Sequence, residues 1–447
     1  MKKIHKILIS ILIILSMTIP MSSTAIDPKY ETVKIGIYYG SSAKDSVQIT
    51  SDAGFNVGYM DGGNFIHLYS FGESSLSVAP TGNSATINVA GSVYDINGGN
   101  YAFAPINGIV KINGAPYRGG VEFIPDSNGK LTVINFVNIN DYIAGVVGKE
   151  MSSSWPIEAL KAQAVCARSF TITTWNKHSH QGFNLCGTQD CQAYLGMSGE
   201  SESTRRAAAE TRDQVVKYGS KIVETLYSSS HGGSSAYSKY VWGSELPYLT
   251  AVEDNFEANT GNPYETWTVV LTKADIEAKL KAKSINIGEV VDFKVTGADE
   301  FGRTYEVTIY GSNGTYVIKN DKTRTFFGLK SQKYRITPSN AAPAGPVQKE
   351  VEFSIVPNEY AYASGVFVDA LGAFHNQTSG ASFWNSGSST ANQNPTPESV
   401  AQYYTLTGHG WGHGLGMSQY GAKGMANLGY DYVAIIEHYY KGAKVSY

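Results

Sequence analysis

Charged residues are scarce in this chain of 447 residues: Asp, Glu, Lys and Arg make up 16% of it, and the formal net charge is −3. A protein that binds nucleic acid through the backbone phosphates needs an excess of basic residues, and this chain has none. The low charge therefore excludes a nucleic-acid partner. The length leaves room for two or three domains and a sizeable core.

Long hydrophobic runs are also missing, except at the amino end. There three lysines precede an apolar run over residues 7–19, which Pro20 ends, and small residues follow at 23–25. This pattern predicts that residues 1–25 are a signal peptide and that the protein is exported to the cell wall or the extracellular space. An uncleaved membrane anchor is the alternative, although the run is short for a bilayer-spanning helix. We expect membrane contact through this segment only.

Cysteine occurs three times. Cys186 and Cys191 share a polar segment with His180, and two thiols and an imidazole at this spacing suit a tetrahedral zinc ion. His178 or Asp190 would supply a further ligand. A Cys186–Cys191 disulfide, natural in an exported protein, is the competing interpretation. We favour one structural zinc ion held by His180, Cys186 and Cys191, and we expect no organic cofactor.

Glycine and tyrosine are abundant, with 47 and 30 residues. Tyrosine suits half-buried strands and carbohydrate contact, so these counts indicate a β-rich extracellular protein. Between residues 32 and 127, short apolar runs alternate with Gly, Asn and Asp turns, which predicts an all-β region. No catalytic cluster is visible in that region, so a wall-binding or docking role is expected for it.

The chain as a whole is predicted to be an α+β protein with a discontinuous, mixed α/β catalytic core. The expected parts are the signal peptide or anchor (1–25), an N-terminal β-rich region (26–128), the first part of the core (129–254), an inserted β-rich subdomain (255–337), linker and surface loops (338–404), and a C-terminal part of the core with a glycine-rich closing loop (405–447). The linker assignment rests on segments rich in Pro, Ala, Gly, Ser and Asn.

The most informative stretch runs over residues 138–170. Its first half is interpreted as a β-rich lead-in that ends at Glu150, and its second half as an amphipathic helix that begins near Ser154. Glu150 would then lie in a loop before a helix start. Lys161 and Arg168 are seven residues apart, which puts them on one helical face as an expected basic stripe. A solvated helix face is the plainer interpretation of that spacing.

Three blocks of sequence carry a resemblance to a known family. They read DYIAGVVGKEM, then WPIEALKAQAVCARSF, then GHGWGHGLGMSQYGAKGMANLGYDYVAIIEHYYKG. They resemble the stage II sporulation protein D family, also called the amidase-enhancer (SpoIID/LytB) family, over about residues 133–447. The resemblance implies a peptidoglycan lytic transglycosylase whose acid is Glu150. The departure lies at Gly148-Lys149, where the family usually has a proline or a small residue before its Glu-Met.

Such an enzyme needs an acid to protonate the leaving oxygen of the glycosidic bond. The C6 hydroxyl of the substrate then acts as the nucleophile, so one carboxyl group serves first as acid and then as base. At a helix start the positive dipole would lower the pKa of Glu150, and burial against Tyr142 or Trp155 would be needed to raise it.

Substrate contacts are expected from side chains that can grip sugar hydroxyls, N-acetyl groups and the lactyl carboxylate. The candidates are Lys161, Arg168, Gln192, Ser230, His413 and Gln419. His413, which lies between glycines, has a plainer interpretation as a hydrogen-bonding residue of a turn. For the zinc site, the resemblance implies a metal in some members, with a histidine immediately before the second cysteine, where this chain has Asp190.

Two other classes of function compete with the transglycosylase. One is a non-catalytic glycan-binding protein that stimulates a wall amidase, and the other is a zinc-dependent wall hydrolase. A hydrolase would need an open coordination position, and two thiolates with one or two histidines look more like a closed site. Glycan strands are the expected partner in each case, together with an amidase in the first.

Overall fold

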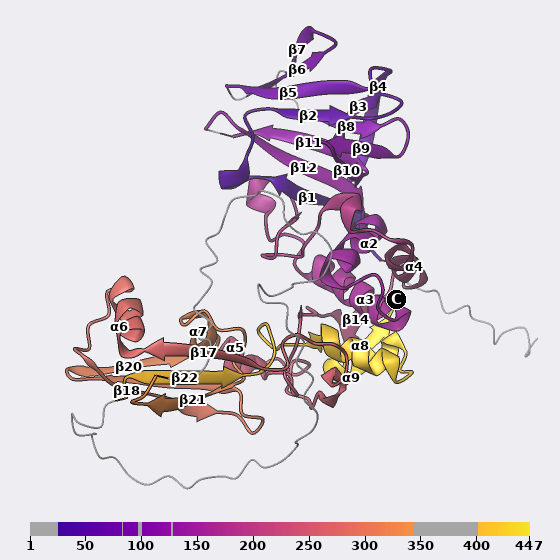
Figure 1. Ribbon diagram of the computed structural model, residues 1–447. Coiled ribbons are helices and arrows are strands. Elements are labelled where there is room, and N and C mark those ends of the chain that lie inside the picture. Colours follow the sequence, from indigo (N-terminus) through magenta and orange to yellow (C-terminus); the bar gives the residue numbers. More distant parts are fainter. Residues whose placement is uncertain (1–25, 83, 97–100, 127, 343–400) are drawn as a thin grey trace, which may run out of the picture.

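The computed structural model describes residues 26–82, 84–96, 101–126, 128–342 and 401–447. Figure 1 shows β-sheets built from the first part of the chain at the top, a group of helices below them, and a second β-rich body at the lower left. The predicted α+β class is confirmed. The signal peptide or anchor at 1–25 and most of the linker at 338–404 lie outside the described residues.

The N-terminal region consists of two packed β-sheets. The seven-stranded sheet has the order β13-β1-β12-β11-β8-β3-β4, and the six-stranded sheet has the order β10-β9-β2-β5-β6-β7. Alternate side chains of strands such as β2 and β9 point inward, so both sheets contribute to one hydrophobic core. The strands are β1 (Thr32–Tyr38), β2 (Val47–Thr50), β3 (Phe55–Asp61), β4 (Asn64–Phe71), β5 (Ser75–Thr81), β6 (Ser84–Val89), β7 (Ser92–Ile96), β8 (Tyr101–Pro105), β9 (Ile109–Ile112), β10 (Ala115–Arg118), β11 (Gly120–Pro125) and β12 (Leu131–Asn138).

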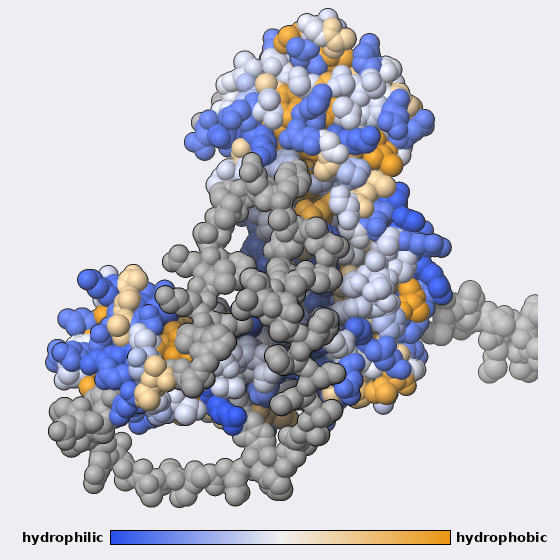
Figure 2. Space-filling model, viewed as in Figure 1, coloured by the Kyte–Doolittle hydropathy of each residue, from blue (hydrophilic) through white to orange (hydrophobic). Residues whose placement is uncertain are grey.

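Two features of these sheets bear on the site. β12 lies between β1 and β11, so the sheet extends to Asn138 and the structure puts the boundary of the first region later than residue 128. β13 (Leu185–Cys186), from the segment with two cysteines, pairs in parallel with β1 at the sheet edge. Apolar side chains remain exposed on the outer strands, for example Leu68 and Val93, and Figure 2 shows such patches among polar surface.

The helical core follows β12 directly. It contains α2 (Ile139–Glu150), α3 (Ile157–Thr173), α4 (Glu202–Glu210), α5 (Ser238–Val241), α8 (Gln419–Asn427) and α9 (Tyr432–Tyr439), with the short strands β14 (Val215–Tyr218), β15 (Lys221–Ile222), β16 (Tyr227–Ser228), β23 (Met417–Ser418) and β24 (Lys444–Ser446). β14 and β15 form a hairpin about Tyr218-Gly219. β16 and β23 pair in parallel, which joins the two halves of the core.

The interpretation of residues before Glu150 as a β-rich lead-in is wrong for residues 139–150, which form helix α2. Asn138 caps this helix by accepting a hydrogen bond from Asn140 N. A Cβ added at Gly148 would lie 1.6 Å from the Gly199 carbonyl oxygen, so the close approach of the neighbouring segment requires glycine there. Glu150 is therefore the last residue of a helix, not a residue before one.

The inserted subdomain has its own hydrophobic core. Its strands form the sheets β17-β22-β21 and β18-β19-β20. The elements are β17 (Trp267–Thr272), α6 (Lys273–Ala282), β18 (Val290–Ala298), β19 (Thr304–Gly311), β20 (Gly314–Lys319), α7 (Lys322–Thr325), β21 (Tyr334–Ser339) and β22 (Tyr403–Gly408). Because β22 pairs with both β17 and β21, the subdomain takes residues 403–408, and the last part of the core begins after Gly408.

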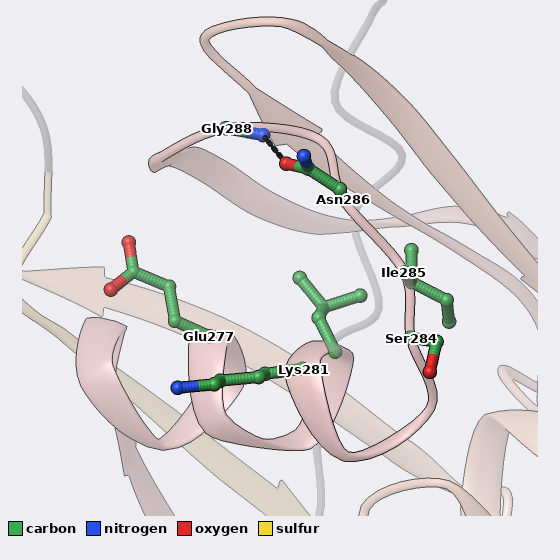
Figure 3. A pocket seen from close by; sticks show the side chains of 7 residues that line it. Glu277, Lys281, Ser284, Ile285, Asn286 and Gly288 are labelled. Atoms are coloured by element: carbon green, nitrogen blue, oxygen red, sulfur yellow. Dashed lines mark hydrogen bonds between the residues drawn. The ribbon is translucent and has the colours of Figure 1, made fainter.

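A pocket of about 350 Å³ lies between α6 and the turn before β18 (Figure 3). Leu280 and Ile285 line it together with Glu277 and Lys281. It contains no cluster of side chains suited to catalysis and belongs to the subdomain surface.

Candidate functional site

Glu150 ends α2 and points at two hydrogen-bond donors from distant parts of the chain. Its Oε1 accepts from Ala193 N at 3.1 Å, and its Oε2 accepts from Gln419 Nε2 at 3.2 Å. Burial raises the pKa of Glu150, and the two hydrogen bonds oppose this effect. The negative end of the α2 dipole acts in the same direction as burial. The expected conflict between dipole and burial therefore does not arise.

Gln192 supports this site from beneath. Its side chain is buried, Nε2 donates to Tyr142 Oη and Thr171 Oγ1, and Oε1 accepts from Tyr227 Oη. Gln192 is thus engaged within the protein, and its contact with substrate finds no support in this geometry. Gln192 instead fixes the residue after it, Ala193, which donates to Glu150.

The predicted basic stripe on α3 does not exist. Arg168 is buried, and its guanidinium donates to the carbonyls of Gln214 and Ala208 and to Asn140 Oδ1. Burial lowers its pKa to about 10. Arg168 thus joins α3 to α2, α4 and the start of β14, and cannot reach a substrate.

Lys161 is also engaged within the protein. Its Nζ lies 2.9 Å from Glu158 Oε1 and 2.5 Å from Glu210 Oε2, and it faces the ring of Tyr432. The seven-residue spacing put Lys161 and Arg168 on one face, but that face packs against α4 and the C-terminal helices. Lys161 is a link between helices, and its assignment to substrate is corrected accordingly.

Helix α8 presents Gln419 to Glu150. Ser418 caps α8 by accepting from Gly421 N, and Gln419 follows it at the first helical position. Tyr420 packs on Trp155 with ring centroids 4.9 Å apart, and Lys423 Nζ lies 5.0 Å from the Trp155 ring. Gln419, predicted to contact substrate, donates to Glu150 Oε2, and its contact with a sugar stays a prediction.

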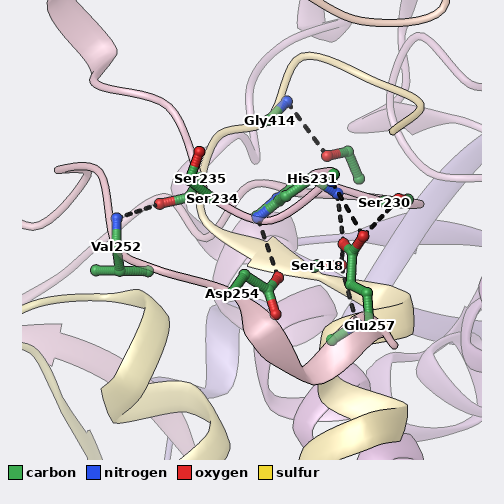
Figure 4. A network of polar contacts seen from close by, with 12 residues as sticks. Ser230, His231, Ser234, Ser235, Val252, Asp254, Glu257, Gly414 and Ser418 are labelled. Carbon is green, nitrogen blue, oxygen red and sulfur yellow. Dashed lines mark hydrogen bonds and ion pairs between the residues drawn. The ribbon is translucent and has the colours of Figure 1, made fainter. Parts of the chain in front are cut away.

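A buried network around Glu257 holds the start of α8 in place (Figure 4). One carboxylate oxygen accepts from Ser230 Oγ at 2.7 Å and the other accepts from His231 N and Ser418 Oγ, both at 2.5 Å. Asn262 donates to Ser230 Oγ at 2.8 Å. Ser230, predicted to bind substrate, is buried and engaged in this network, so its role is to position other residues.

His231 and Asp254 form a second buried pair beside this network. His231 Nδ1 lies 3.5 Å from Asp254 Oδ2, and both side chains are inaccessible (Figure 4). Burial, helped by the charge of Glu257, raises the pKa of Asp254 to about 8, and burial lowers the pKa of His231. Near neutral pH the pair is therefore largely uncharged, an acid beside a neutral imidazole.

His413 belongs to the glycine-rich loop between β22 and β23. Its Nδ1 accepts from Leu415 N at 2.9 Å, and burial lowers its pKa to about 4. Gly414 has a φ of 80°, and a Cβ there would lie 2.6 Å from Arg303 Nη1, so the loop passes the buried Arg303 at close range. The interpretation of His413 as a turn residue fits the structure better than contact with substrate.

Four potential metal ligands converge in the segment that follows α3. Ligand atoms of His178, Cys186, Asp190 and Cys191 all lie within 4.8 Å of one another. The assignment of His180 as a metal ligand is corrected. His180 is exposed and its ring lies 6.3 Å from that of His178, and His178 is the histidine that belongs to the cluster. The three cysteines are free thiols.

The arrangement around His178 fits a metal. Its Nδ1 is paired with Gln181 Oε1 at 2.9 Å, and its buried Nε2 lies 3.3 Å from Asp190 Oδ2, another potential ligand. A ligating histidine is usually oriented in this way through its other nitrogen. Two thiols, one imidazole and one carboxylate together match the donors of a closed tetrahedral zinc site.

Sequence reasoning missed Glu257 and Asn262, which hold the start of α8 in place. The available signal was weak, namely two acids and an asparagine in a short segment between the core and the inserted subdomain. None of the helices in the part of the chain that the structure describes has the length and apolar character needed to cross a membrane.

Comparison with known proteins finds a family model and several relatives that match this chain. The family model described as stage II sporulation protein matches residues 127–218. The chain is 26% identical over 417 residues to an amidase enhancer of Bacillus subtilis (strain 168), which covers 92% of this chain and 54% of that protein. It is 28% identical over 335 residues to an uncharacterized protein of Brachyspira hyodysenteriae, covering 75% and 73% of the two chains.

A third relative is a stage II sporulation protein D of Bacillus subtilis (strain 168), 24% identical over 325 residues, which covers 69% of this chain and 75% of the relative. The chain spans about half the length of the amidase enhancer that it matches, 54% of that protein.

Proposed function

Because the chain belongs to the stage II sporulation protein D (SpoIID/LytB) family, we propose that it acts on the cell wall as a peptidoglycan lytic transglycosylase. The observation that carries this proposal is the environment of Glu150, a partly buried carboxyl group with a raised pKa between Ala193 N and Gln419 Nε2. A general acid that works near neutral pH needs such an environment. The names of the relatives support a role in cell-wall processing or sporulation.

The reaction then proceeds in two proton transfers at one residue. Glu150 gives its proton to the glycosidic oxygen as the bond from that oxygen to the anomeric carbon breaks. The C6 hydroxyl oxygen of the same sugar bonds to the anomeric carbon and returns its proton to Glu150. The product is a 1,6-anhydro end, and no water is consumed. Gln419 orients the carboxyl group throughout.

Mass spectrometry of purified glycan strands incubated with the protein tests this proposal. Anhydro-ended fragments would support a transglycosylase, whereas fragments with free reducing ends or cut stem peptides would contradict it. Incubation of the same strands with no protein gives the background of anhydro ends.

A structural zinc ion is part of the proposal. His178, Cys186, Asp190 and Cys191 would hold it, and it would tie the segment after α3 to the edge of the N-terminal sheet. Four protein donors leave no open position for a water molecule, which argues against a zinc hydrolase. The chain is proposed to work outside the cell on glycan strands.

One relative favours a second candidate function. The amidase enhancer matches along 92% of this chain, and its name describes an effect on another enzyme. A non-catalytic protein that binds glycan and stimulates a wall amidase would leave glycan strands uncut and increase the release of stem peptides when an amidase is added. The incubation above, repeated with an amidase, separates this candidate from the transglycosylase.

A further inference from the structure

Three partly exposed side chains from distant segments meet beside the glycine-rich loop. The rings of Tyr264 and Trp411 lie edge to face with centroids 4.4 Å apart. Lys330 Nζ lies 5.6 Å from the first ring and 5.4 Å from the second. Tyr264 precedes β17, Trp411 belongs to the glycine-rich loop, and Lys330 comes from the inserted subdomain. We call these three residues the aromatic–lysine cluster.

Backbone hydrogen bonds fix the cluster in place. Trp411 and Ser230 exchange two of them, at 2.8 and 3.1 Å. Gly410 N donates to the Tyr264 carbonyl, and Gly412 N donates to the Lys330 carbonyl, both at 2.8 Å. A surface fixed in this way loses little conformational entropy when it binds a ligand.

The cluster continues the surface that begins at Glu150. Tyr420, which follows Gln419, donates its backbone N–H to the Ser229 carbonyl at 3.1 Å, while Trp411 is anchored on Ser230. These two anchors are consecutive residues, with Cα atoms about 3.8 Å apart. Two aromatic pairs, each with a lysine, are therefore anchored on neighbouring residues of one segment.

Lys330 is available to a ligand. Its side chain is partly exposed, no ion pair joins it to a carboxylate of the described residues, and burial lowers its pKa. Its ammonium group lies near two aromatic rings, in a place where an added anion would find a positive charge without a competitor.

We propose that Tyr264, Trp411 and Lys330 form a sugar-binding subsite that extends the Glu150 site along a glycan strand and accepts a ring bearing a carboxylate. The aromatic rings offer apolar faces to the C–H faces of a sugar, and Lys330 pairs with the carboxylate. The identity of the strand rests on the proposed function. The subsite also gives the inserted subdomain a role, because it supplies Lys330.

Binding measurements in a Glu150→Gln background test the subsite without turnover. Isothermal titration would use neutral chitooligosaccharides of increasing length, and strand fragments with free lactyl groups. Trp411→Ala and, separately, Tyr264→Ala should weaken binding of the long ligands about tenfold, the effect of one well-packed aromatic contact. Short ligands that fill only the surroundings of Glu150 should bind equally well. Trp242→Ala, which removes a tryptophan that is 46% exposed beside α5, is the matched control.

Lys330→Ala should weaken only the carboxylate-bearing fragments, and Lys330→Arg should restore them. Unchanged affinity for long ligands in folded Trp411→Ala and Tyr264→Ala proteins would overturn the subsite. This outcome is distinct from a failure of the proposed function, which would appear as wild-type protein that binds long ligands through Trp411 yet produces no anhydro ends.

Discussion

Two groups donate hydrogen bonds to Glu150. One is the backbone amide of Ala193, and the other is the side chain of Gln419, which a substitution can remove. Both stabilise the ionised carboxylate, so removal of either should favour the protonated form. We expect Gln419→Ala to raise the pKa of Glu150 further and to move the alkaline limb of the pH–rate profile to higher pH.

The measurement is the cleavage rate of glycan strands as a function of pH, with Gln48→Ala in the N-terminal sheet as the control. A lower rate with an unmoved alkaline limb would mean that Gln419 affects packing but not the protonation of Glu150.

Asp254 makes a second pH-dependent contribution, to stability. Its pKa is about 8 in the folded protein against an ordinary value of 3.8, so between these values the folded state holds a proton that the unfolded state has lost. Stability must then fall as pH rises through this window, by up to about 1.4 kcal/mol per pH unit. His231 acts in the opposite direction, but only below its ordinary pKa of 6.5, because its folded pKa is lowered.

Between pH 6.5 and about 8, the protonation of Asp254 rather than that of His231 therefore changes the stability of the folded protein. Melting temperatures measured across this range should fall with pH in the wild type, and Asp254→Asn should flatten the slope. Asp52→Asn, at an exposed turn, should retain the wild-type slope. Equal slopes in all three proteins would show that Asp254 is ionised in the folded state.

Single residues differ in how well the sequence identified them. Glu150 was predicted from the resemblance and Gln419 from its ability to bind sugar groups, and the structure brings them together although they are far apart in sequence. Arg168 was misplaced because a seven-residue spacing gives a shared face but not whether that face is buried. Ser230 was wrongly assigned to substrate. Its hydrogen-bond partner Glu257 comes from another segment, and sequence spacing does not reveal such a contact.

The segment between β13 and Gln192 couples the proposed zinc ion to the acid. Cys186 lies in β13 on the sheet edge, Cys191 precedes the buried Gln192, and Ala193 then donates to Glu150. Loss of the metal should therefore weaken two contacts: the hydrogen bond from Ala193 to Glu150, and the pairing of β13 with β1 at the sheet edge. We expect zinc chelation to lower both melting temperature and glycan cleavage.

The two histidines of this segment provide a matched pair of variants. His178→Ala should lower the zinc content well below one ion per chain and lower the melting temperature, because it removes a ligand at the cluster. His180→Ala should change neither, since His180 is exposed and outside the cluster. Elemental analysis of both purified proteins checks this, and zinc loss from the His180 variant alone would refute the ligand set.

Helix α2 was missed for a physical reason. Its residues include Ile143, Val146 and Val147, β-branched side chains that favour strands when read locally. Their spacing with Ile139 and Tyr142 also fits one face of a helix, and the packing of that face in the main core decides the outcome. Helices α8 and α9 carry local signals of their ends, because Gly429 follows the first with a positive φ and Asp431 caps the second.

The N-terminal sheets and the helical core share one hydrophobic core, whereas the inserted subdomain has a separate one. β12 belongs to the first region and leads directly into α2, and it loses both neighbours, β1 and β11, if the chain begins at residue 129. The expected docking module is thus also a structural support for the helix that carries Glu150.

A fragment of residues 129–447 should consequently aggregate or lack native structure, while residues 26–447 should fold. Circular dichroism and size-exclusion chromatography of the two proteins check this. A soluble, monomeric and cooperatively melting 129–447 fragment would show that the sheets are dispensable for the core.

The decisive comparison is between wild-type and Glu150→Gln proteins in cleavage of purified glycan strands. Glutamine retains the size of the side chain and most of its hydrogen bonding but has no proton to give. The rate of formation of anhydro ends should fall by at least about two orders of magnitude, with binding of the strand and melting temperature close to wild type. Glu210→Gln, which alters an exposed carboxylate paired with Lys161, should remain active. A folded Glu150→Gln protein that still forms anhydro ends at nearly the wild-type rate would contradict the assignment of Glu150 as the acid.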